Sequence, residues 1–151
     1  GRCRSGYEAS LRARISCDSK HQLFFHPCVP HHQLLSRLAE HDIGFAGELS
    51  HCRSRDLTIS NKLFQYLLAG LVVLASKTAG QKEISDAHPN LLHAFEGDSA
   101  ASLANILNQI LANQSQIQTE KEEAIKLAET KYCWEESKNI LLTTVSEALK
   151  Q

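Results

Sequence analysis

Residues 58–76 read TISNKLFQYLLAGLVVLAS, and this stretch decides the fold. Ser60 or Asn61 can cap an amphipathic helix that Gly70 ends, and the apolar run after that glycine has the character of a buried strand. Lys62 lies in the first turn of this helix, where a cation opposes the helix dipole. A bound anion would offset that cost, because free backbone N–H groups and a lysine both bind phosphate. The stretch therefore predicts an anion site at a helix N-terminus, with a merely solvated Lys62 as the alternative.

The rest of the chain alternates between strand-like and helix-like segments, which favours an α/β fold with a parallel sheet. The polar segment 47–57 is expected to be a loop. Strands are expected at 22–25, 42–46, 71–76 and 91–95. Helices are expected at 7–16, 32–40, 60–69, 81–87, 99–112, 117–131 and 134–149. The sequence therefore predicts a Rossmann-like, doubly wound parallel sheet of about four strands, incomplete and followed by a helical C-terminal tail.

Composition limits the classes of protein and partner. The 151 residues are one domain's length of chain, and 16 basic against 17 acidic residues give no bulk attraction to nucleic acid or to an anionic membrane. No apolar run approaches the roughly 20 residues that form a transmembrane segment, which leaves peripheral membrane association open. The five cysteines are scattered without a C-x-x-C pair, so we expect reduced thiols and a cytoplasmic location.

Possible metal ligands gather in one segment, which contains His26, Cys28, His31 and His32. Their spacing does not match a structural zinc site, because no second pair of ligands follows at the usual interval. We therefore expect no metal, and interpret these side chains as loop residues exposed to water.

Several motifs carry a resemblance to a known family. NKLFQYLLAGLVVLAS, followed by TAGQKEI, is similar to SKxFEYLAAGxPVVAS…GGxxE. The segments 23–30, 38–44 and 132–136 resemble V-x-F-x-G-x-V-P, L-x-x-A-D-I-G and Y-x-W-E, respectively. These are motifs of the group 1 (family 4) GT-B glycosyltransferases. The resemblance covers essentially the whole chain and implies the C-terminal donor-binding domain of such an enzyme.

In that family, two further strands and a whole acceptor-binding domain precede the part that matches. The resemblance therefore implies that 1–151 is a partial donor domain, truncated at its N-terminal side, with the acceptor domain absent. Two central strands would belong between the strands at 22–25 and 42–46. We expect the isolated chain to be marginally stable, prone to aggregation and inactive as a transferase.

The resemblance also implies a donor substrate, a nucleotide-sugar, and a site for it. Lys62 and the backbone N–H groups of Ser60 to Lys62, including Asn61, would hold the diphosphate without a metal cofactor. Gln65 shares the helix face of Lys62 and stands where the family commonly has a glutamate that binds the ribose. Leu57 stands where many relatives carry another glutamate, eight positions earlier.

Further residues complete the predicted donor site. Val29 would lie against the nucleotide base, and Arg53 or Arg55 would assist in holding the diphosphate. Glu48 would approach the sugar from the loop that follows the strand expected at 42–46. Glu83 matches the glutamate of G-G-x-x-E. A surface or capping role for Glu48 and an ordinary first-turn role for Glu83 are the alternatives. No residue is a convincing general base, so the catalytic residues are unassigned.

Three functions are compatible with these residues. The preferred one is transfer of a sugar from a nucleotide-sugar to a saccharide, lipid or protein acceptor. A nucleotide-sugar epimerase of GT-B architecture shares the fold but needs an acid/base pair that does not stand out in this sequence. The third is a non-catalytic doubly wound module that binds an anion or a protein partner through Lys62.

Overall fold

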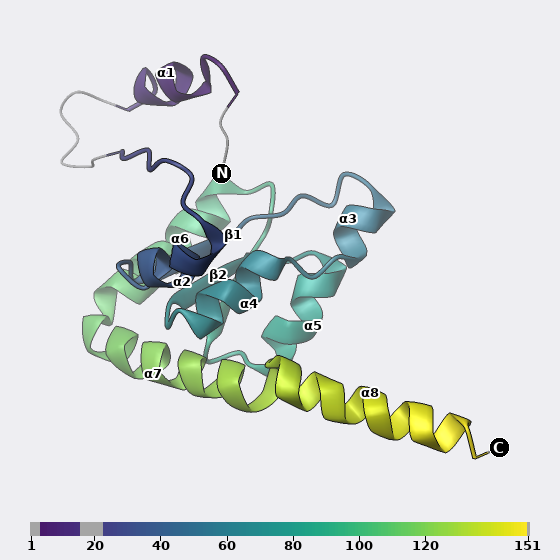
Figure 1. Ribbon diagram of the computed structural model, residues 1–151. Coiled ribbons are helices and arrows are strands. Elements are labelled where there is room, and N and C mark those ends of the chain that lie inside the picture. Colours follow the sequence, from purple (N-terminus) through teal and green to yellow (C-terminus); the bar gives the residue numbers. More distant parts are fainter. Residues whose placement is uncertain (1–3, 16–22, 151) are drawn as a thin grey trace. The chain divides into compact units, whose positions relative to one another are not determined.

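The computed structural model describes residues 4–15 and 23–150, and Figure 1 shows their helices and strands. Internal contacts divide the chain into two units, Gly1–Leu34 and Leu35–Gln151. Helix α2, His31–Leu38, runs across the boundary between them.

The first unit contains one short helix, α1, Tyr7–Arg12, among its described residues. Arg12 donates a 2.9 Å hydrogen bond from Nε to Glu8 and one of 3.2 Å to the carbonyl oxygen of Leu23. Its guanidinium also lies 5.2 Å from the centre of the Phe25 ring. None of the described residues of this unit is buried.

The strand expected at 22–25 is not confirmed. Residues 23–30 form neither strand nor helix, and Gln22 lies outside the described residues. The apolar pattern predicted a strand, but a strand persists only when a neighbouring strand satisfies its N–H and C=O groups. No such ladder reaches 23–25 within the described structure. The helix expected at 7–16 ends early at Arg12, and Ser16 also lies outside the described residues.

The second unit is mixed α/β, and its described residues form a parallel three-stranded sheet in the order β1-β2-β3. These strands are β1, Ile43–Ala46, β2, Val72–Ser76, and β3, Leu92–Phe95. β2 pairs with β1 on one edge and with β3 on the other, and all five of its residues are buried. A central strand covered on both faces requires an unbroken apolar run, which explains the sequence LVVLAS.

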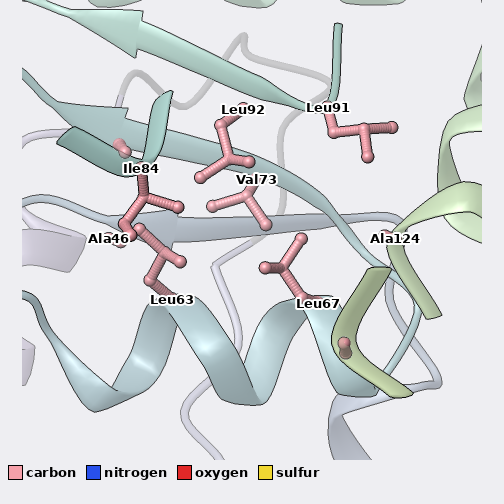
Figure 2. Close-up of a cluster of buried hydrophobic side chains, with 10 residues drawn as sticks. Ala46, Leu63, Leu67, Val73, Ile84, Leu91, Leu92 and Ala124 are labelled. Atoms are coloured by element: carbon pink, nitrogen blue, oxygen red, sulfur yellow. The ribbon is translucent and has the colours of Figure 1, made fainter. Parts of the chain in front are cut away.

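One face of the sheet is covered by α4, Asn61–Leu68, and α5, Ala79–Ala87. Leu63 and Leu67 of α4 point toward Val73 of β2, as Figure 2 shows. The two leucines are four residues apart and therefore lie on one side of the helix. The polar side of α4 is left to face away from the sheet.

The opposite face of the sheet packs against α6, Ala100–Ala112. Side chains alternate along a strand, so Val72 and Leu74 point to this face while Val73 points to the other. Ile110 of α6 completes the cluster with these two residues. Helix α7, Gln114–Lys131, packs at both clusters, through Ile117 in this one and Ala124 and Ala128 in the other.

Most of the expected helices and strands are present with shifted ends, and the structure also contains one helix that was not expected. The segment 47–57 was expected to be a loop, but it contains a short helix, α3, Arg53–Leu57. α5 begins two residues earlier than expected because Thr78 caps it, its hydroxyl accepting a hydrogen bond from the N–H of Gln81. The tail ends with α8, Trp134–Ala148, in which no residue is buried.

Candidate anion-binding site

An open cavity of about 390 Å³ lies where α4 begins. α4 precedes β2 and runs back along the sheet, so its N-terminus lies on the side where the parallel strands end. This is the edge at which open parallel sheets bind ligands. The cavity is lined by Glu48, Arg55, Thr58, Ile59, Ser60, Asn61, Lys62 and Gln65.

The packing of α4 determines which of its residues face this cavity. Leu63 and Leu67 are wholly buried against the sheet, so Asn61, Lys62 and Gln65 lie on the other side of the helix. Ser60 is the N-cap residue and has an extended backbone, but no side chain caps the first N–H groups of α4. The structure thus brings together the predicted donor-site residues of this helix. Their role in binding a donor stays a prediction.

Glu48 occupies the position next to Lys62 at which the sequence predicts a bound anion. Its Oε1 lies 2.7 Å from Lys62 Nζ, and its Oε2 lies 3.9 Å from Arg55 Nη1. The Glu48 side chain is only 18% exposed. The hydrogen bond from Lys62 lowers the pKa of Glu48, and a hydrogen bond from Ser60 and the charge of Arg55 act in the same direction, against the effect of burial. The lysine in the first turn of α4 therefore has an internal counterion.

A buried network holds the backbone of Glu48 in this position. Its N–H donates a 2.8 Å hydrogen bond to Ser76 Oγ at the end of β2. Gln81 Nε2 donates to the same oxygen at 2.9 Å, and the Ser76 hydroxyl donates to the carbonyl oxygen of Ala46. Gln81 is wholly buried, and its Oε1 has no hydrogen-bond partner among the described residues. Sequence reasoning missed both Ser76 and Gln81, although a polar residue closing an apolar strand was a signal.

A second cavity, of about 320 Å³, adjoins the first. Glu48 lines both cavities. Lys77 Nζ and Glu96 Oε1 form an ion pair of 2.7 Å at the second cavity. Its other lining residues are Leu49, Ser50, His51, Ser76, Thr78, Gly97 and Asp98.

Two predicted site residues are not placed at these cavities. Glu83 is an exposed residue of α5 and is not among the residues that line either cavity. Burial, with the charge of Glu83 as a smaller cause, raises the pKa of Tyr132. Val29 belongs to the first unit, and its predicted contact with a nucleotide base stays a prediction. Arg53 lies on α3, but the cavity is lined by Arg55.

Within residues 4–15 and 23–150, no group of three or more His, Cys, Asp or Glu side chains is placed to hold a metal ion. Across the same residues, no helix has the length and apolar character needed to cross a bilayer.

No family model, curated protein or solved structure matches this chain.

Proposed function

We propose that this protein binds the diphosphate of a nucleotide-sugar at the start of α4, as the donor-binding part of a GT-B glycosyltransferase. The observation that carries the proposal is the pairing of two cations, Lys62 and Arg55, around one carboxylate in a cavity at the carboxyl ends of parallel strands. Phosphate oxygens can replace that carboxylate with the same two cations and the uncapped N–H groups of α4.

The chemistry of glycosyl transfer suits such a site. As the bond to the sugar breaks, negative charge grows on the departing nucleoside diphosphate, and Lys62 and Arg55 would stabilise it. Gln65 lies on the same cavity and offers one amide oxygen to a ribose hydroxyl. This division of roles requires no metal ion bound by the chain.

The order of the strands supports the doubly wound form of the fold. In a sheet of order 3-2-1-4-5-6, the strands 4-5-6 are parallel neighbours in sequence order, as are β1, β2 and β3. The switch point, where ligands bind, then lies beside the first of the three. Glu48 follows that strand, β1, whose other edge has no partner among the described strands. We therefore propose that the three strands form one half of a doubly wound sheet.

One observation favours a non-catalytic module as the second candidate. Lys62 is already neutralised by Glu48, so its position in the first turn of α4 has a purely structural explanation. A structural lysine would leave the affinity for nucleoside diphosphates unchanged when replaced. The free thiols Cys28, Cys52 and Cys133 support a cytoplasmic location under either function.

The test is a calorimetric titration of UDP, GDP and ADP into the wild-type protein and the Lys62→Ala variant. The loss of one charge-assisted interaction is expected to weaken diphosphate binding by about 1.5–3 kcal/mol, or roughly 10- to 150-fold. Lys82→Ala is the matched control, because Lys82 pairs with Asp86 on α5 and lines neither cavity. Gln65→Glu is expected to retain binding. Equal affinities of wild type and Lys62→Ala would remove Lys62 from the site and favour the second candidate.

A further inference from the structure

Glu48 is held by the groups that a phosphate would use. Lys62, Ser60 and Arg55 all act on its carboxylate, and both side-chain oxygens lie within ion-pair distance of a cation. A phosphate cannot bind these cations while the carboxylate stays between them, because the two anions would repel each other at contact distance. A phosphate ligand and Glu48 therefore exclude one another.

We propose that Glu48 is an internal competitor for this site, and that a diphosphate binds by displacing its carboxylate toward the second cavity. The inference rests on the proposed function of the same site. It identifies Glu48 as the residue that determines how tightly an anion can bind there.

The structure provides room for this displacement. The backbone of Glu48 is fixed by the bond from its N–H to Ser76 Oγ, so the side chain can rotate without moving the loop. Because Glu48 lines both cavities, the second one offers adjacent space for the carboxylate when it rotates away from Lys62. The ionisable groups that line this cavity are His51, Lys77, Glu96 and Asp98. Lys77 can accept the displaced carboxylate as it already accepts that of Glu96.

The ligand, and not a change of pH, is expected to drive the exchange. Lys62 holds the pKa of Glu48 below its usual value of 4.5, so the carboxylate stays charged near neutral pH. An incoming diphosphate carries more negative charge than the carboxylate and can bind Lys62 and Arg55 together. The free-energy cost of releasing Glu48 from Lys62 and Arg55 therefore weakens every anion affinity that is measured for the wild-type protein.

The experiment titrates inorganic pyrophosphate into wild type, Glu48→Gln and Glu123→Gln at neutral pH. Glu48→Gln keeps the shape of the side chain but removes its charge, and is expected to bind pyrophosphate roughly fivefold more tightly or better, since no ion pair has to be broken. Glu123→Gln changes the net charge of the protein equally on an exposed part of α7 that lines neither cavity, so its affinity is expected to stay near that of wild type.

The outcomes separate this inference from the proposed function. If wild type binds pyrophosphate and Glu48→Gln binds it no more tightly than Glu123→Gln does, the role of Glu48 as a competitor is contradicted while the proposed anion site stands. If neither wild type nor Glu48→Gln binds pyrophosphate or UDP, both the proposed anion site and the role of Glu48 as its competitor are contradicted. Glu48→Asp provides a second variant should Glu48→Gln fold poorly. Its shorter side chain withdraws the carboxylate from Lys62, and it is also expected to bind pyrophosphate more tightly than wild type.

Discussion

Ser76 connects three parts of the second unit through one hydroxyl group. Its oxygen accepts hydrogen bonds from the N–H of Glu48 and from the amide of Gln81, and its proton is donated to the carbonyl oxygen of Ala46. A hydroxyl has two lone pairs and one proton, so Ser76 uses its full capacity. The residue is 1% exposed, which means that water cannot replace any of these partners.

Ser76→Ala is therefore expected to lower the free energy of unfolding by about 1–3 kcal/mol, the cost of buried groups left without partners. Urea denaturation measures the change. Ser137→Ala is the control, because the exposed Ser137 hydroxyl bonds only to the carbonyl oxygen of Cys133. Adding Gln81→Leu to Ser76→Ala should recover part of the loss by removing the unpaired amide. Equal losses in Ser76→Ala and Ser137→Ala would contradict this account of the network.

At single residues, helix periodicity predicted more of the site than motif matching did. Lys62 and Gln65 share a cavity because the spacing of the buried leucines on α4 requires it. The pairing of Lys62 with Glu48 could not be predicted, since it depends on how the loop after β1 folds over the end of β2. Glu83 matched a motif, but on α5 it lies away from both cavities. Motif order alone does not report the direction of a side chain.

At the scale of elements, polar contacts attach α7 to the rest of the second unit at two points. In the middle of the helix, Lys121 Nζ lies 2.9 Å from Asp42 Oδ1, just before β1. At its end, the hydroxyl of Tyr132 lies 3.0 Å from Nε2 of His88, which follows α5. Lys131 Nζ is 3.3 Å from the same nitrogen. Burial, and then the charge of Lys131, lower the pKa of His88 below its usual value of 6.5.

This lowered pKa predicts a pH dependence of stability. Below pH 6.5 the unfolded chain protonates His88 while the folded state resists it, so the unfolded state binds more protons. The free energy of unfolding is expected to fall as the pH drops through 6.5 toward the lowered pKa, and to be independent of His88 at higher pH. Urea unfolding at about pH 7.5 and about pH 5.5 measures the difference.

His88→Gln removes the titration and should flatten this dependence, and His51→Gln is the control on an exposed histidine. Glu48 does not interfere, because its lowered pKa places its effect below pH 4.5, where stability is lost as the pH falls. An unchanged pH dependence in His88→Gln would contradict the assignment.

Elements with strong apolar periodicity were predicted well, and those decided by tertiary contacts were not. β2 and α4 follow directly from the stretch 58–76. α3 was missed because its sequence RSRDL has no apolar face to signal a helix. The segment 23–25 has the apolar residues of a strand but lacks a described neighbour to pair with. The apolar pattern of a segment indicates which side chains it can bury, but the neighbouring element determines whether they are buried.

At the scale of the whole molecule, exposed apolar surface gathers on α8. Trp134, Leu141, Val145 and Leu149 recur at intervals of about one or two turns and lie on one face of the helix. All four are exposed, Trp134 to 66% and Leu149 to 82%. Phe45 on β1 adds an exposed aromatic side chain. Surfaces of this kind favour self-association.

We expect the purified protein to associate as its concentration rises, and Leu141→Gln with Val145→Gln to reduce that association. Neither side chain is buried, so the melting temperature should change little. Sedimentation velocity over a range of concentrations measures the first effect, and thermal unfolding measures the second. Asn139→Gln with Thr143→Gln alters the opposite side of the same helix and is the control. Equal association of both double variants would show that the apolar face of α8 is not responsible.

The central position of β2 also has a consequence for motion. Its backbone amides are enclosed by β1 and β3 at the edges and by helices on the faces, so they can meet solvent only when the sheet itself opens. The side chains of Glu48 and of the first turn of α4 line an open cavity at the rim, so they can exchange partners without opening of the sheet. Rearrangements at the rim therefore do not require global unfolding, and β2 stays in place while they occur.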